Sequence, residues 1–292
     1  MNLDSYRRLL AGETLTFVLS PRALWRMTGS DRVRYLNGQV TNDIARLASG
    51  QACYAAVCTA KGRMEGDLHI AVHDDAFYLD SDFSQHESLG SRLDKYLIAD
   101  DAVVEDLGDQ WSLSHVFGEI PPSVPPNGFV VANPRFGLPG HDVWIAGAGP
   151  VLVGDPVEAD VVETLRLEHA IPRWGVELNA NTLPPEGGPH LLRAISYTKG
   201  CYVGQETIAR LKSVGHVTRI LVLLQADGDL PPAPGTKLTK DAQKVGLVVS
   251  SGFSPRLGKA IALGYVRYQL AGEGTPFLAG DLNLTVAAPL RK

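Results

Sequence analysis

The chain has 292 residues, 45% of them hydrophobic and 20% charged, which supports a buried core and favours two domains. The net charge of −5 argues against a protein that coats nucleic acid through bulk charge. No run approaches the roughly 18 apolar residues that span a bilayer, and the first residues do not read as a secretory signal, so we expect a cytoplasmic protein without membrane attachment.

The first element with a clear pattern is a helix predicted over residues 30–40. Ser30 is a candidate N-cap, and Val33, Leu36 and Val40 fall on one helical face. The next three residues, TND, are cap and turn formers that end the helix. This segment therefore predicts an amphipathic helix followed by a sharp turn.

Strands are predicted next, over residues 52–80, with turns at residues 61–62 (KG) and 73–75 (HDD). Cys53 and Cys58 lie in the first apolar run. We expect both to pack in a strand or in the turn after it, because their spacing does not match a zinc knuckle. Three cysteines in the whole chain make a disulfide scaffold unlikely and suit a reducing compartment.

Two further helices follow. The first begins at Ser84, with Glu87 three residues later as a capping box, and its expected buried face is Leu89, Leu93, Tyr96 and Leu97. The second is predicted over residues 155–172, capped by Asp155 and closed before Pro172. Residues 174–188 then form a long irregular stretch rich in Asn, Pro and Gly, of a kind that is often functional.

The character of the chain changes near residue 214. Short apolar strands separated by Pro/Gly turns predict a small all-β barrel or sandwich. We therefore divide the chain into an α+β region over residues 1–213 and a β-barrel over residues 214–292.

Cys201 has the most informative surroundings, in SYTKGCYVGQETIARL. Gly200 and Gly204 flank it and permit a tight turn, and QETIARL reads as the start of a helix. A thiol near a helix N-terminus, with Lys199 close by, would ionise and react more readily. A buried structural cysteine is an equal alternative on chemistry alone. No nearby His or Asp offers a general base, which disfavours a Cys–His protease.

The octapeptide KGCYVGQE resembles the signature K-G-C-Y-x-G-Q-E of the YgfZ family, folate-binding relatives of the glycine cleavage T protein. Other segments resemble that superfamily along nearly the whole chain: RVRYLNGQVTND, CTAKGRM, RLEHAIPRWGVEL, LPPEGG and LGYVR. The octapeptide is specific, whereas each of the others is weak by itself.

The resemblance implies a T-protein-like folate-binding region of two related α/β halves, followed by a small C-terminal β-barrel. It also implies a role in the assembly or repair of iron–sulfur enzymes, of which tRNA-methylthiolating enzymes are the best-known clients. The family's key cysteine corresponds to Cys201. The implied cofactor is tetrahydrofolate or a one-carbon-substituted folate.

For the folate site, Glu186 in PPEGG matches the carboxylate that T-protein relatives use to accept the N–H donors of a reduced pterin. Its alternative is a solvated loop glutamate. Trp174 matches an aromatic position that lines the pterin pocket, and its alternative is a domain-interface anchor. Arg210, Arg193 and Lys199 are candidate cationic contacts for the ligand, or solvated side chains.

Asp67 is a partial match. T proteins carry two aspartates after the K-G turn, one of which attends the reacting folate nitrogen, whereas here Gly66 precedes Asp67. An acid at that point could steer one-carbon transfer, so Asp67 is a candidate catalytic residue. The missing carboxylate weakens the case for aminomethyl transfer. We expect Asn42 and Asp43 to cap their turn rather than contact the ligand.

Three functions remain in competition. The first is a folate-dependent accessory factor for iron–sulfur client enzymes, with Cys201 as its reactive thiol. The second is a true enzyme, a tetrahydrofolate-dependent aminomethyltransferase or demethylase. The third is a non-catalytic module that senses folate. In each case we expect no direct contact with nucleic acid, so an effect on tRNA would pass through a client enzyme.

Overall fold

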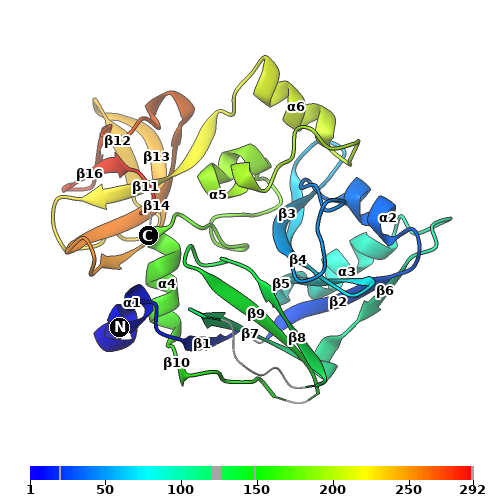
Figure 1. The fold of residues 1–292 in the computed structure, drawn as a ribbon. Coiled ribbons are helices and arrows are strands. Elements are labelled where there is room, and N and C mark those ends of the chain that lie inside the picture. Colours follow the sequence, from blue (N-terminus) through cyan, green and yellow to red (C-terminus); the bar gives the residue numbers. More distant parts are fainter. Residues whose placement is uncertain (20, 120–125, 148, 291–292) are drawn as a thin grey trace.

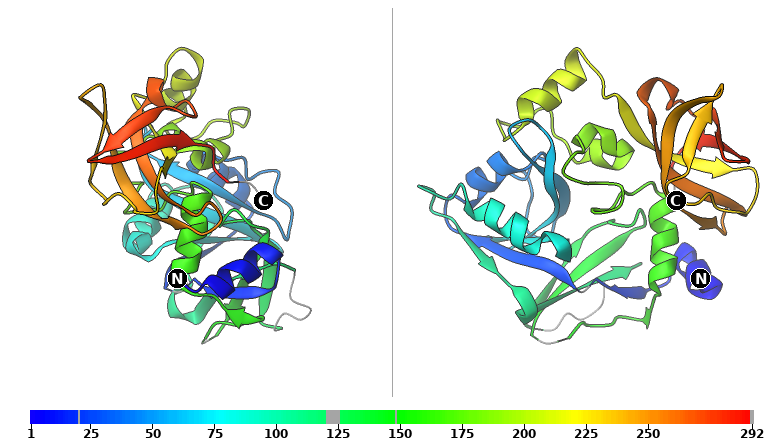
Figure 2. Two further views of the ribbon diagram at one scale, coloured as in Figure 1. Left: turned by 90° about the vertical axis from the view of Figure 1, so that its left-hand side faces the viewer. Right: turned by 180° about the vertical axis from the view of Figure 1, so that it is seen from behind.

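The structure is a computed structural model that describes residues 1–19, 21–119, 126–147 and 149–290. In these residues the strands form two five-stranded sheets and a closed six-stranded barrel. Figure 1 shows three lobes around a centre into which α5 (Gly188–Arg193) projects, and Figure 2 shows them from the side and from behind. The predicted fold, an α+β region followed by a small β-barrel, is confirmed.

The first sheet has the strand order β3-β4-β5-β2-β6 and its pairs are antiparallel. Buried and half-buried side chains alternate along most of its β4 strand, the pattern of a strand with one face toward a core. Its elements are β2 (Arg22–Thr28), α2 (Arg32–Gln39), β3 (Ala52–Cys58), β4 (Met64–His73), β5 (Ala76–Asp82), η1 (Phe83–Gln85), α3 (His86–Asp94) and β6 (Val103–Asp106).

The second sheet has the order β10-β1-β7-β9-β8, with a short parallel pair between β1 and β10 and antiparallel pairs elsewhere. A cluster of buried apolar side chains joins this sheet to its helices. Its elements are α1 (Leu3–Ala11), β1 (Leu15–Val18), η2 (Gly108–Gln110), β7 (Trp111–Phe117), β8 (Gly128–Ala132), β9 (Gly140–Ala146), β10 (Asp155–Pro156) and α4 (Ala159–Glu168).

A linking segment and the barrel complete the described chain. The linking segment holds η3 (Pro184–Gly187), α5 and α6 (Gln205–Ser213), and the predicted domain boundary at residue 214 falls between the end of α6 and the first barrel strand. The barrel core consists mainly of Val, Leu and Ala side chains. Its elements are β11 (Arg219–Ala226), β12 (Lys237–Lys240), β13 (Gln243–Ser254), β14 (Lys259–Arg267), η4 (Tyr268–Leu270), β15 (Pro276–Ala279) and β16 (Leu282–Ala287).

Most predicted core positions are confirmed. Leu36, Val40, Leu89 and Leu93 are fully buried. Cys53 and Cys58 both lie in β3, half-buried and buried respectively. Tyr96 is an exception: α3 ends before it, and it is 42% exposed with the guanidinium of Arg92 packed 4.5 Å from its ring centroid.

The predicted helix caps are wrong. The hydroxyl of Ser30 donates to Asp101, 71 residues away, and Asp31 precedes α2 instead. Ser84 lies inside η1 and bonds Asp82. Asp155 belongs to β10 and pairs with Arg8. Ser30 and Asp155 bond to partners from elsewhere in the fold, whereas Ser84 is displaced as cap by its neighbour Asp82. Among the described helices, none has the length and apolar character needed to cross a bilayer.

Candidate functional site

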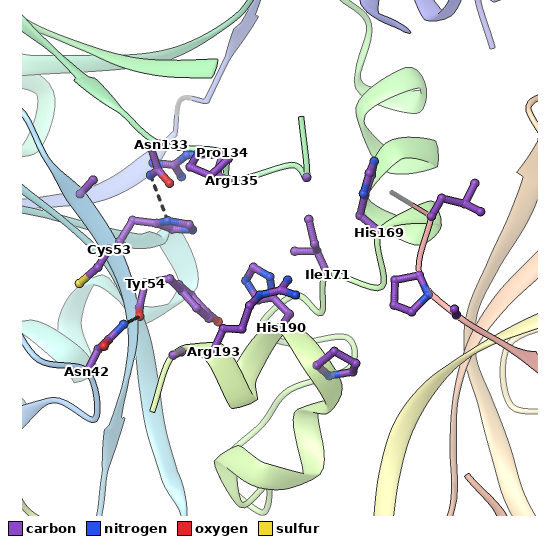
Figure 3. Close-up of a pocket in the computed structure, with 18 residues that line it drawn as sticks. Asn42, Cys53, Tyr54, Asn133, Pro134, Arg135, His169, Ile171, His190 and Arg193 are labelled. Carbon is purple, nitrogen blue, oxygen red and sulfur yellow. Dashed lines mark hydrogen bonds between the residues drawn. The ribbon is translucent and has the colours of Figure 1, made fainter. Parts of the chain in front are cut away.

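A cavity of about 690 Å³ lies where the two sheets, α5 and the end of the barrel region meet, and we call it the wide chamber. Figure 3 shows side chains from β3, the loop after β8, the segment after α4 and α5 around it. A smaller space of about 110 Å³, the narrow chamber, adjoins it. The two chambers share five lining residues, namely Tyr54, His69, Arg135, Ile171 and His190.

Tyr54 and Asp67 meet in the narrow chamber. Tyr54 on β3 is in register with His69 on β4, and Asp67 lies two residues before His69, so the three side chains share a face of the sheet. The Tyr54 hydroxyl donates to Oδ2 of Asp67 at 2.6 Å, and Gln85 Nε2 donates to Oδ1 at 3.3 Å. Burial raises the pKa of the Asp67 carboxyl and raises that of Tyr54 well above its ordinary value.

Two imidazoles flank the Tyr54 ring. The ring centroids of His69 and His190 lie 4.9 Å and 4.8 Å from it. Burial, assisted by the charge of Arg193, lowers the pKa of His190 to about 3. Burial and nearby Arg135 likewise lower the pKa of His69 well below its ordinary value. Both rings are therefore neutral near pH 7, and this wall is aromatic and uncharged.

Arg135 holds the two sheets together beside the cavity. Its guanidinium contacts Asp80 on β5 at 2.8 Å and Asp142 on β9 at 2.5 Å. Asp142 also accepts a hydrogen bond from the side-chain amide of Asn133 and is hydrogen-bonded to the ring of His115. Burial opposes the charge of Asp80, but Arg135 and Arg22 together outweigh it and lower the pKa of Asp80 to about 2. Sequence reasoning missed this network, because its members lie far apart in the chain and form no local pattern.

Of the predicted site residues, the structure brings Asp67 and Trp174 together in the narrow chamber. Trp174 is half-buried in the loop after α4 and forms an isolated bridge with Leu178. Arg193, weighed as a ligand contact, lines the wide chamber. Arg210 is exposed on α6 and is not among the lining residues of either chamber. Asn42 forms hydrogen bonds within its turn and to Tyr54, and it also lines the wide chamber.

Glu186 differs from the prediction. Its carboxylate is buried, receives Nε of Arg219 at 3.2 Å and accepts the backbone N–H of Leu183 at 3.4 Å. It is not among the lining residues of the two chambers. Arg219 begins the first barrel strand, so this ion pair joins Glu186 to the barrel.

Two other glutamates also bond the barrel, and the three follow one another at intervals of nine residues. Glu168 receives the Ser254 hydroxyl at 2.5 Å, and Glu177 receives the Ser250 hydroxyl. Both serines lie on β13 of the barrel. With Glu186, these buried carboxylates anchor the barrel at three successive points. The nine-residue spacing is visible in the sequence, but nothing local indicates its partner.

Cys201 is exposed, whereas the other two cysteines are not. The predicted turn into a helix is present: Gly204, with φ +86°, is the N-cap of α6, and Cys201 lies three residues before it. Lys199, the predicted support for the thiol or a cofactor, bonds to the backbone. Its buried ammonium donates to the carbonyl oxygens of Asn37, Val40 and Asn42, and burial lowers its pKa to about 8.

The class of fold follows from two comparisons. Residues 219–289 match the family model of the glycine cleavage T-protein C-terminal barrel domain. The crystal structure of the glycine cleavage system aminomethyltransferase T from Bartonella henselae superposes with a TM-score of 0.83 at 21% identity, covering 97% of this chain and 88% of that one. The chain therefore has the T-protein fold.

Relatives that align along most of the chain indicate the family. The tRNA-modifying protein YgfZ of Yersinia pestis (strain Pestoides F) is 29% identical over 278 residues, which is 82% of this chain and 81% of that protein. The protein of the same name from Aliivibrio fischeri (strain MJ11) is 26% identical over 263 residues, 80% and 79% of the two chains. These similarities support the YgfZ family, related to the glycine cleavage T protein, as the family of this chain.

Proposed function

We propose that this protein is a folate-binding accessory factor that supports the assembly or repair of iron–sulfur enzymes, with Cys201 as its reactive thiol. An effect on tRNA methylthiolation would then be indirect, through an iron–sulfur client enzyme and without contact to tRNA. The relatives are named tRNA-modifying proteins, which supports the effect on tRNA. The resemblance of KGCYVGQE to the family signature supports the iron–sulfur step.

The observation that carries the folate proposal is that the two chambers are lined by different kinds of side chain. The narrow chamber offers the Asp67 carboxylate and the flat rings of Tyr54 and Trp174. A reduced pterin is a flat heterocycle with N–H donors, which a carboxylate accepts and an aromatic ring covers. We therefore assign ring recognition to this chamber, with Asp67 in place of Glu186.

The narrow chamber is lined by four arginines as well as by Asp67 and Asp82, whereas the wide chamber lacks carboxylates in its described lining. Its lining contains no Asp or Glu among the described residues, and it includes Arg193 and three histidines. The buried Nε2 of one of these, His169, has no hydrogen-bond partner in the described part of the chain. Such a lining suits the carboxylates of a folate tail. A ligand with its ring in the narrow chamber would direct its tail here.

The thiol proposal depends on exposure. Burial raises the pKa of Cys53 and of Cys58 to about 12, which keeps both as unreactive thiols. Cys201 alone among the three is exposed to a reagent or client protein.

The decisive experiment is complementation of bacteria that lack their own YgfZ-type factor, with tRNA methylthiolation measured by mass spectrometry. We expect the wild-type chain to restore methylthiolation and Cys201→Ser to fail at equal protein level. Thr198→Ala, an exposed change in the same loop, is the matched control and should restore it. Restoration of methylthiolation by Cys201→Ser would overturn the proposed role of the thiol and would favour a folate sensor. Failure of a well-expressed wild type would overturn the accessory role.

Aminomethyl transfer or demethylation is the second candidate. It is favoured by the buried Asp67, whose raised pKa suits a group that handles a proton, and by the fold of an aminomethyltransferase. Turnover of tetrahydrofolate with an aminomethyl-lipoyl carrier protein tests it. Turnover that Asp67→Asn abolishes would establish an enzyme, and turnover no faster than the reaction without protein would exclude this reaction.

A further inference from the structure

The loop that carries Cys201 is docked on the end of α2, and we call residues 194–204 the presenting loop. The hydroxyl of Thr41 donates to the carbonyl of Ala194 at 2.7 Å. The amide of Ser196 donates to the Thr41 carbonyl at 2.9 Å, and the amide of Val203 donates to the Gly38 carbonyl at 3.0 Å. These bonds join two segments that are some 160 residues apart in the chain, on either side of the cysteine.

Lys199 adds the central attachment. Its Nζ is 2.6 Å from the Asn37 carbonyl, 2.9 Å from that of Val40 and 2.6 Å from that of Asn42. An ammonium has three protons, so these carbonyls use its full donor capacity. The carbonyls at a helix C-terminus carry partial negative charge and lack partners within the helix, which makes a buried cation favourable there.

The far end of the loop is held by close backbone approach. A Cβ at Gly204 would lie 2.5 Å from the Thr59 carbonyl, and one at Gly62 would lie 2.9 Å from the Cβ of Thr207 on α6. Both glycines have positive φ angles. Tyr202 is buried against the same core, whereas Cys201 is exposed. Cys201 is thus an exposed residue in a loop that is fixed on both sides.

We infer that Lys199 is a positioning residue: its ammonium clamps the presenting loop to carbonyls at and just beyond the C-terminus of α2 and so sets where the Cys201 thiol is displayed. The charge of Lys199 is satisfied by backbone oxygens and does not activate the thiol. The consequence for activity rests on the proposed function of Cys201, but the clamp itself is a property of the fold.

The test uses the full chain with Lys199→Met, which keeps most of the length of the side chain and removes its three donors. Lys212→Met is the matched control, because Lys212 packs over the Tyr197 ring from the exposed side of α6 and bonds none of these carbonyls. Hydrogen exchange of the Ser196 and Val203 amides reports docking. The pH at which alkylation of Cys201 by iodoacetamide reaches half its maximal rate reports activation.

We expect Lys199→Met to speed exchange of both amides by about tenfold or more, since an unmet buried acceptor costs about 1–3 kcal/mol. The half-maximal pH of alkylation should stay within about 0.3 of the wild type, because an electrostatic role would move it by more. Unchanged exchange, or a half-maximal pH that rises by about 1, would overturn the inference. Lys212→Met should leave both measurements unchanged.

Lys199→Gln is a milder variant that still tests the clamp if Lys199→Met unfolds the whole protein. Its amide keeps two donors, so exchange should be intermediate between wild type and Lys199→Met; exchange as slow as in the wild type would contradict the clamp. In complementation, Lys199→Met should restore less methylthiolation than Lys212→Met at equal protein level. If the wild type itself restores none, the proposed function fails, while the exchange result still decides the clamp.

Discussion

The cavity and the presenting loop are built in opposite ways. The cavity draws its walls from β3, β4, the loop after β8, α5 and the last residues before the C-terminus, and most of its polar groups already have partners. The presenting loop is one contiguous segment, fixed by its backbone and by Lys199, that leaves a single thiol exposed. A short motif can specify the loop, whereas the cavity exists only after the two sheets and the barrel have assembled.

This contrast predicts where substitutions act on stability and where they act on function. The cavity is bordered by buried charges, so changes there should cost free energy of unfolding. The presenting loop displays an exposed residue, so a change at the thiol should cost function alone. The predictions below test that separation, from the largest expected effect to the smallest.

Arg135→Met should destabilise the protein by about 3–5 kcal/mol, because buried Asp142 loses its guanidinium partner and buried Asp80 keeps only Arg22. Urea unfolding measures the effect. Arg26→Met is the control: it removes an arginine paired with Glu105 at the surface, where both side chains are more than one third exposed, and should cost about 1 kcal/mol or less. Equal losses for the two variants would contradict the structural role of the Arg135 network.

Asp67→Asn should weaken tetrahydrofolate binding by about tenfold to a hundredfold, the loss of a hydrogen bond to a charged group of about 1.5–3 kcal/mol. Because burial raises the pKa of Asp67, the carboxylate is lost at a higher pH than for an ordinary aspartate. Wild-type affinity should therefore fall as the pH falls through that raised pKa, and the affinity of Asp67→Asn should not. Anaerobic titration calorimetry across pH measures both, and a parallel pH profile for the two proteins would exclude Asp67 as the ring contact.

Glu186→Gln should cost about 1 kcal/mol or less of stability, since its partner Arg219 is 42% exposed and the pair is partly screened. Tetrahydrofolate affinity should change by less than about twofold, as expected for a barrel anchor outside both chambers. A loss of affinity above about tenfold would restore the role that the sequence suggested for this residue.

Cys201→Ser should leave the free energy of unfolding within about 0.5 kcal/mol of the wild type, as is usual for an exposed substitution. Thermal and urea unfolding measure it. A larger loss of stability would mean that the thiol is part of the packing, and any loss of function in this variant would then have a structural explanation.

Local sequence patterns predicted the secondary-structure elements well, but they predicted the hydrogen-bond partners of polar side chains poorly. The apolar spacing of Leu36, Val40, Leu89 and Leu93 predicted buried helix faces, because that periodicity depends only on the helix itself. Two of the three predicted helix caps, Ser30 and Asp155, bond instead to distant residues, as Ser30 does to Asp101. A side chain that can form either a local or a distant hydrogen bond cannot be assigned from its neighbours in the sequence alone.

The candidate site divides in the same way. Asp67 and Trp174 were identified from segments that resemble the T protein, and the narrow chamber holds both. Tyr54, His69, His190 and the Arg135 network were missed, because no pattern in the chain marks residues that meet only across strands or between sheets.

By itself the sequence determined the order of the regions, the barrel after residue 214, and the turn that carries Cys201 into α6. These depend on composition, periodicity and glycine conformation, all of which are local. Only the tertiary structure decided which way the charged side chains face. Lys199 turns to the carbonyls of α2 and Glu186 to the barrel, because a buried charge settles on whichever partner the assembled fold brings within reach.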